Sequence, residues 1–161
     1  MLRVLLILIN SFLLLTLFYF SQLFPVKFFH MINSDKFDKL LILSIIKVES
    51  NFNPYAESHV GAYGLMQILP STAQWLNEKF GLNLDYKVPE DNLKLGIFYL
   101  DYLYNNTKDL EEALVFYNTG PNASEEIKKY SGERYLKKIK NAYLIYKLLY
   151  WSDQYESSYF K

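Results

Sequence analysis

An apolar run near the start of the sequence limits what the rest of the chain can fold into. Between Val4 and Phe20 nearly every residue is Leu, Ile, Val, Phe or Tyr, and the run extends to Phe24. At about 1.5 Å of helical rise per residue, some twenty residues cross the roughly 30 Å hydrocarbon layer of a bilayer. The run therefore predicts a membrane anchor over residues 1–24. About 120 to 130 residues then remain, which is enough for one domain with one core.

The flanks of this run distinguish an anchor from a cleaved signal peptide. A signal peptide has an apolar stretch of about 7 to 15 residues, followed by a cleavage site with small side chains. Here the run is longer, and the residues from Phe18 to Pro25 are mostly bulky. An uncleaved anchor is favoured, and the signal peptide is the alternative. Because Arg3 precedes the run, the positive-inside tendency places the rest of the chain on the extracytoplasmic side.

Helix-breaking residues divide the remainder of the chain into helical segments. The breakers are Pro70, Gly81, Pro89, Gly120-Pro121 and Gly132. Ser34 or Asp35 is expected to cap the first helix, and no run alternates apolar and polar residues as a half-buried strand does. The sequence predicts an all-α fold, with a compact domain over residues 34–151, a linker over residues 25–33 and a C-terminal tail over residues 152–161.

Charge and cysteine content exclude several classes of function. Lysine plus arginine and aspartate plus glutamate number 17 each, so the formal net charge is zero and nucleic-acid binding is not predicted. Basic residues cluster only at Lys128-Lys129 and at Lys137 to Lys140, a pattern typical of solvated helix faces. The absence of cysteine excludes disulfides and thiolate metal sites. His59 has no second histidine nearby, so neither a metal nor a cofactor is predicted.

Glu49 is the candidate catalytic residue. It follows Ile42, Ile45 and Ile46 by seven, four and three positions, so it lies on the apolar stripe of its helix. Burial opposes ionisation and raises the pKa of a glutamate, which keeps the carboxyl protonated near neutral pH and able to donate a proton. The alternative is an acid that turns to solvent at the end of its helix.

The loop after this helix provides material for one wall of a cleft. Pro54 ends the helix by disfavouring helical geometry at Asn53. Gly61 and Gly64 then allow backbone turns and close approaches that other residues resist. The loop also carries Gln67, whose amide is suited to hydrogen bonding.

Four ordered motifs resemble those of the soluble lytic transglycosylase family. They are Glu49-Ser50, the stretch from Gly61 to Gln67, the stretch from Tyr117 to Pro121, and Tyr135-Leu136. Several motifs in one order are much harder to match by chance than one short pattern. The resemblance implies a lysozyme-like domain that cleaves the glycan strands of peptidoglycan.

The resemblance also implies roles for individual residues. Ser58 and Gln67 match the polar substrate contacts of the family, and a local loop contact is the alternative for each. Met66 matches an apolar wall. Tyr117 would place its hydroxyl beside Glu49 and orient it, and Tyr135 matches the second tyrosine of that pocket. Two apolar departures from the family pattern, Phe116 and Leu69, are expected to alter subsite width without removing the chemistry.

The implied mechanism uses one carboxylate, whereas ordinary glycosidases use two. Glu49 would protonate the bond between N-acetylmuramic acid and N-acetylglucosamine, then deprotonate the sugar's own C6 hydroxyl to give a 1,6-anhydro end. Two alternatives stay open. A goose-type-lysozyme-like hydrolase would use Asp85 or Asp101 to position water, and a non-catalytic scaffold would only bind peptidoglycan. The implied partners are peptidoglycan strands, the membrane through the N-terminal helix, and an unidentified envelope-spanning machinery.

Overall fold

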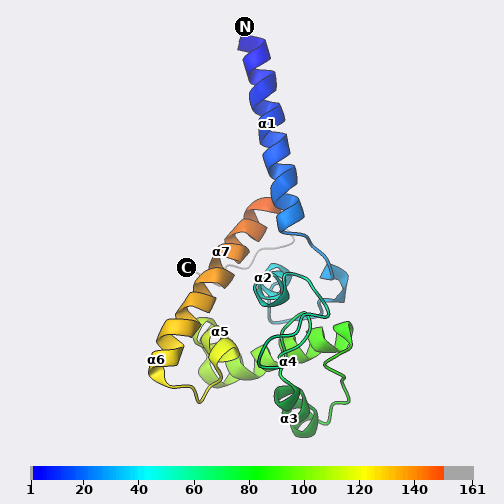
Figure 1. Ribbon diagram of the computed structural model, residues 1–161, viewed down its shortest axis with the longest axis vertical. Coiled ribbons are helices and arrows are strands. Elements are labelled where there is room, and N and C mark those ends of the chain that lie inside the picture. Colours follow the sequence, from blue (N-terminus) through cyan, green and yellow to red (C-terminus); the bar gives the residue numbers. More distant parts are fainter. Residues whose placement is uncertain (1, 151–161) are drawn as a thin grey trace.

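The computed structural model describes residues 2–150, and its regular structure is helical (Figure 1). In chain order the elements are α1 (Leu2–Leu23), a 3-10 turn (Phe29–Met31), α2 (Lys39–Ser50), α3 (Pro70–Phe80), α4 (Pro89–Thr107), α5 (Leu110–Thr119), α6 (Glu125–Ile127), a π turn (Lys128–Gly132) and α7 (Glu133–Leu149). The β pairing within residues 2–150 is limited to two isolated bridges. The predicted all-α fold is confirmed, and the tail predicted over residues 152–161 lies outside the described residues.

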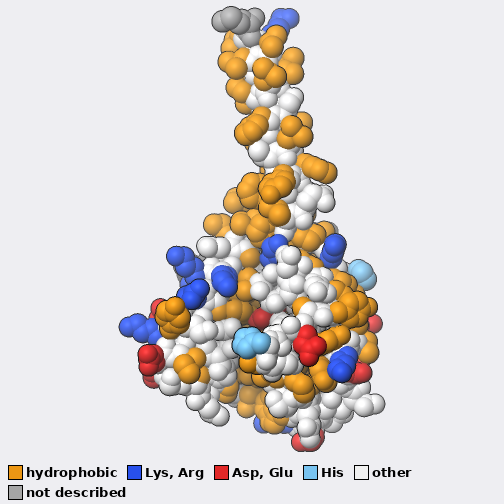
Figure 2. Space-filling model, in the orientation of Figure 1, with side chains coloured by type: hydrophobic (Ala, Val, Ile, Leu, Met, Phe, Trp, Pro, Cys, Tyr) orange, Lys and Arg blue, Asp and Glu red, His pale blue; other side chains and the backbone are white. Residues whose placement is uncertain are grey.

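Helix α1 projects from the globular part as a stalk (Figures 1 and 2). None of its 22 residues is buried, although most of them are apolar. At about 1.5 Å per residue the helix is roughly 33 Å long, close to the thickness of a bilayer's hydrocarbon layer. By length and composition, α1 is therefore able to cross a membrane.

Helix α2 lies at the centre of the globular part and packs along α7 (Figure 1). Its residues from Leu40 to Ile46 are all buried, so this helix is enclosed on every side. The predicted cap is corrected here: Oδ1 of Asp38 accepts a 2.8 Å hydrogen bond from the Leu40 amide. Ser34 instead closes an earlier turn, in which its hydroxyl accepts from the Phe37 amide and the Phe37 ring enters the core.

The segment predicted as a linker packs against the globular part. Ile32 is 1% exposed, and Phe28, Phe29 and Met31 lie against the core. The segment therefore anchors the chain between α1 and α2 and is not a free spacer.

The other helix ends follow the breakers read from the sequence. Pro70 and Pro89 occupy the first turns of α3 and α4, and Gly81 ends α3 in the left-handed conformation. Asp109 caps the start of helix α5, where its side chain accepts from two backbone amides, and Gly120 follows the last residue of the helix.

The sequence predicts that Gly132 interrupts the helical structure, but it does not. Its backbone is helical, and the π turn runs through it directly into α7. A Cβ at Gly132 would lie 2.5 Å from Cγ1 of Val115. The missing side chain therefore allows the π turn to approach α5 closely, as their packing requires.

Candidate active site

Glu49 lies in the last turn of α2, where it meets the start of α7. The Tyr135 hydroxyl donates a 2.7 Å hydrogen bond to Oε1 of Glu49. Oε2 has no hydrogen-bond partner within residues 2–150, where no fully buried side-chain oxygen lacks one. Oε2 therefore keeps contact with solvent.

The surroundings of Glu49 set its proton affinity. Burial raises the pKa of Glu49 from 4.5 to about 7, while the Tyr135 hydrogen bond and the positive charge of Lys138 both act to lower it. Desolvation is the largest of these effects because the protein around the carboxyl removes water that would stabilise its charge. A carboxyl with a pKa near neutrality can both give and take a proton.

Tyr117 lies close to Glu49 but does not hydrogen-bond to it. The negative charge of Glu49 contributes to a pKa of Tyr117 well above the usual value, although burial is the larger cause. The Tyr117 hydroxyl donates a 2.8 Å hydrogen bond to the backbone carbonyl of Met66. Tyr117 therefore supports the loop beside the carboxylate, and Tyr135 makes the direct contact.

The loop between α2 and α3 is held against the end of α2. The Ser50 hydroxyl donates a 2.9 Å hydrogen bond to the Leu65 carbonyl. The fully buried Asn92 side chain accepts from the Met66 amide and donates to the carbonyls of Tyr63 and Tyr86. These bonds satisfy buried backbone groups, so one amide side chain from α4 fixes the path of the loop.

Gly64 allows Asn92 to approach the loop. A Cβ at Gly64 would lie 2.5 Å from Nδ2 of Asn92, and the φ angle of Gly64 is +80°. Both observations require glycine at this position.

The side chain of Gln67 turns back onto its own loop. Its Nε2 donates to the carbonyls of Ala56 and Gly64 at 3.1 and 3.0 Å, and its backbone has the left-handed φ of 49°. Oε1 has no partner within residues 2–150 and, by the argument used for Glu49, reaches solvent. The amide is held in one orientation and presents an acceptor outward.

Ser58 closes the outer turn of the same loop. Its hydroxyl oxygen accepts a 3.0 Å hydrogen bond from the Ala62 amide, and its own amide donates to the Ala62 carbonyl. The hydroxyl proton is available to an acceptor outside the loop.

Met66 occupies the core beneath the loop. Its side chain is 0% exposed, and a Cβ at Gly96 would lie 2.6 to 2.8 Å from atoms of that side chain. Met66 therefore supports the site through its packing on α4 and through the carbonyl that accepts from Tyr117.

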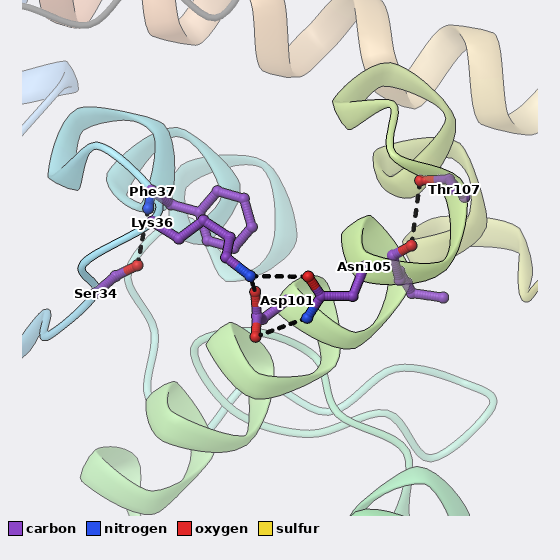
Figure 3. A network of polar contacts seen from close by, with 7 residues as sticks. Ser34, Lys36, Phe37, Asp101, Asn105 and Thr107 are labelled. Atoms are coloured by element: carbon purple, nitrogen blue, oxygen red, sulfur yellow. Dashed lines mark hydrogen bonds and ion pairs between the residues drawn. The ribbon is translucent and has the colours of Figure 1, made fainter.

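Asp101 and Asp85, the residues considered for positioning water, are engaged elsewhere. Asp101 pairs with Lys36 and accepts from Nδ2 of Asn105 (Figure 3). It lines a cavity of about 590 Å³ whose lining does not include Glu49. Asp85 is exposed and accepts a hydrogen bond from the Lys87 amide in its own turn.

Two residues of the site carried little signal in the sequence. Asn92 follows two acidic residues in the first turn of α4 and resembles an ordinary exposed residue until the loop packs on it. Lys138 belongs to a basic cluster that was interpreted as a solvated face, and Figure 2 shows Lys and Arg side chains on the flank formed by α6 and α7. A signal for Lys138 was its spacing of three residues from Tyr135 on one helix.

Residues 2–150 contain no group of three His, Asp or Glu side chains that could hold a metal ion.

The fold is thus a helical domain in which Tyr135 of α7 holds the half-buried carboxyl of Glu49 at the end of α2. The model of the transglycosylase SLT domain family matches residues 28–140. The chain belongs to this family.

Two curated relatives and one solved structure show which members of the family this chain is similar to. It is 39% identical over 88 residues to a soluble lytic murein transglycosylase from Salmonella typhimurium, and the aligned segment covers 49% of this chain and 13% of the relative. It is 43% identical over 77 residues to a membrane-bound lytic murein transglycosylase E from Buchnera aphidicola, which covers 44% of this chain and 35% of the relative.

The solved structure is that of an inactive glutamate-to-glutamine variant of lytic transglycosylase Slt from Pseudomonas aeruginosa. The two folds match with a TM-score of 0.67 and 26% identity, over 78% of this chain and 24% of that chain. This chain thus spans about a third or less of the proteins that it matches.

Proposed function

We propose that this protein is a lytic transglycosylase that cleaves peptidoglycan between N-acetylmuramic acid and N-acetylglucosamine without consuming water. The observation that carries the proposal is the pKa of about 7 at Glu49, in a chain of the SLT family. The named relatives, lytic murein transglycosylases, support the same reaction.

Glu49 supplies both proton transfers in the proposed mechanism. In its protonated form it donates the proton to the bridging oxygen, so that the glycosidic bond breaks and a cationic centre develops at C1 of the muramoyl sugar. The 2-acetamido group of that sugar stabilises the cation. Glu49, now ionised, then takes the proton of the C6 hydroxyl, whose oxygen bonds to C1 and closes the 1,6-anhydro ring. A pKa near the working pH serves both steps.

The surrounding groups hold this carboxyl and the sugar in place. The Tyr135 hydrogen bond fixes the carboxyl and helps to stabilise its ionised form after the first step. The outward Oε1 of Gln67 is suited to accept from an acetamido N–H, and the Ser58 hydroxyl to donate to a sugar oxygen. Met66 and Tyr117 keep the loop beside the carboxyl through their mutual hydrogen bond.

The site is proposed to work on the extracytoplasmic side of a membrane that α1 crosses. The length and apolarity of α1 and the membrane-bound relative both support an anchor. Arg3 before the helix supports this orientation.

Mass spectrometry of the digestion products tests the proposal directly. Purified peptidoglycan treated with the full-length protein should yield muropeptides with 1,6-anhydromuramic acid ends. Glu49→Gln keeps the size of the side chain and removes the titratable proton, so the same digestion should give no such products. Reducing ends carrying oxygen from labelled water would assign the protein to the hydrolases instead.

A further inference from the structure

Two exposed leucines interrupt the polar surface of α7 close to its end. Leu144 and Leu148 are 59% and 71% exposed and are four residues apart, so they lie on one face of the helix. The turns before them expose charged residues such as Arg134 and Lys137 on that side. Figure 2 shows hydrophobic side chains continuing from the stalk of α1 onto the adjoining shoulder of the globular part.

The end of α7 is tied directly to the end of α1. The Tyr146 hydroxyl donates a 2.9 Å hydrogen bond to the Pro25 carbonyl, and the Tyr150 hydroxyl donates a 2.7 Å bond to the Phe24 carbonyl. The Phe24 ring meets the Tyr146 ring edge-on at 5.4 Å, and Nζ of Lys47 lies 5.1 Å from the centre of the Phe24 ring. These contacts fix the orientation of the globular part relative to α1.

The dimensions of a bilayer place the leucines at its surface. The headgroup layer extends about 5 to 8 Å beyond the hydrocarbon on each side. Leu148 and Leu144 precede Tyr150 by two and six residues, which is roughly 3 and 9 Å along the helix. Because Tyr150 is bonded to the residue that follows α1, both leucines lie within or at the edge of this layer when α1 spans the membrane.

We propose that Leu144 and Leu148 form a shoulder with the exposed Val26 and Lys27, which follow α1, and with the half-buried Lys147, and that this shoulder rests in the headgroup layer of the membrane that α1 crosses. The proposal depends on the membrane anchor proposed above. Leucine side chains at the boundary between headgroups and acyl chains remove apolar surface from water, and lysines beside them reach lipid phosphates. The half-buried Tyr150 is suited to the same layer, where tyrosine is enriched.

The shoulder has a consequence for the active site. Lys47, which lies against Phe24 at the end of α1, is two residues before Glu49 in α2. A globular part that rests on the bilayer therefore holds the Glu49 carboxyl at a fixed, short height above the membrane. An active site held at this height selects glycan strands that lie next to the membrane surface.

Lipid-quenching fluorescence tests the shoulder, and the absence of cysteine in the chain makes single labels straightforward. Full-length Leu148→Cys, Ile127→Cys and Leu13→Cys proteins are each labelled with a small fluorophore and reconstituted into vesicles whose lipids carry bromine at defined acyl positions. Ile127 is the matched control, since it is an exposed aliphatic residue on α6, on the order of 30 Å along the helical path from Leu148. Leu13 reports the middle of α1.

The proposal expects bromine near the headgroup to quench the label at position 148 at least twofold. The label at position 127 should not be quenched. The label at position 13 should be quenched by bromine near the bilayer centre. Equal, negligible quenching at positions 148 and 127, with position 13 quenched, would overturn the shoulder and leave the anchor intact. A label at 148 that is hidden from aqueous iodide but not quenched by lipid would mean that a protein covers this face, which also overturns the proposal. An unquenched label at position 13 would remove the anchor on which the shoulder depends.

Discussion

The hydroxyl of Tyr135 donates a 2.7 Å hydrogen bond to Oε1 of Glu49 and so joins the start of α7 to the end of α2. This bond opposes the effect of burial, since it favours the ionised carboxyl while desolvation favours the protonated one. Burial is the larger of the two effects, and the pKa settles at about 7.

Removing this hydroxyl is expected to raise the pKa of Glu49 further. In Tyr135→Phe the ring still fills its place, but the ionised carboxylate loses a donor worth roughly 1.5 to 3 kcal/mol, which corresponds to about one to two pKa units. Activity at neutral pH should fall about tenfold or more, because a carboxyl with a higher pKa is a weaker proton donor in the first step and has lost the hydroxyl that holds it in place. The measurement is the pH profile of peptidoglycan turnover, which should move toward higher pH.

Tyr143→Phe is the matched control for this change. Tyr143 lies on the same helix and donates a 2.7 Å hydrogen bond to a carboxylate oxygen of Asp38, at the other end of α2. This variant should lower the melting temperature without moving the pH profile. A shift of the profile in both variants, or in neither, would contradict the role given to Tyr135.

The charge of Lys138 is expected to tune the same carboxyl in a manner that depends on salt. Lys138 lowers the pKa of Glu49 through its positive charge but is exposed, so ions screen the interaction. In Lys138→Gln the pH profile should move upward by a few tenths of a unit at low ionic strength and coincide with that of the unchanged protein at about 1 M salt. Lys137→Gln makes the same charge change on the neighbouring residue and should shift the profile less at every salt concentration.

The sequence predicted those parts of the site that depend on local pattern. Glu49 was found because it shares a stripe with isoleucines, and the helix ends at Gly81 and Gly120 because glycine stops helices. Contacts between distant segments left no such pattern. The hydroxyl of Tyr117 donates to the backbone carbonyl of Met66, 51 residues away, and the spacing of residues in the sequence does not predict this partner.

Asn92 also makes contacts with a distant segment that no local sequence pattern predicts. Replacing its side chain leaves the Met66 amide and the Tyr86 carbonyl without this partner, while the Tyr63 carbonyl keeps the hydrogen bond from the Ile68 amide. Unsatisfied buried groups cost about 1 to 3 kcal/mol each, so Asn92→Ala should destabilise the domain by roughly 3 kcal/mol or more. Thermal unfolding measures the loss. Asn105→Ala, an exposed change on the same helix, should cost less than about 1 kcal/mol, and equal losses in the two variants would contradict this account.

Glu49 itself is expected to reduce stability at neutral pH. Its folded pKa of about 7 lies above its ordinary value of 4.5. Below pH 4.5 both the folded and unfolded states hold the proton and the stability associated with this group is complete. As the pH rises through 7, the unfolded chain releases the proton more readily, and that stability is lost.

The variant Glu49→Gln removes this dependence while keeping the shape of the side chain. Near pH 4 it should melt close to the unchanged protein, and near pH 8 it should be more stable by an amount that approaches about 3 kcal/mol at most, or several degrees in melting temperature. The measurement is thermal unfolding of both full-length proteins in detergent at the two pH values. Glu57→Gln removes an exposed carboxylate from the neighbouring loop and should leave the two melting temperatures alike at each pH. A stability difference for Glu49→Gln that stays constant from pH 4 to pH 8 would mean that its carboxyl does not titrate near neutrality, which removes the basis for its two proton transfers.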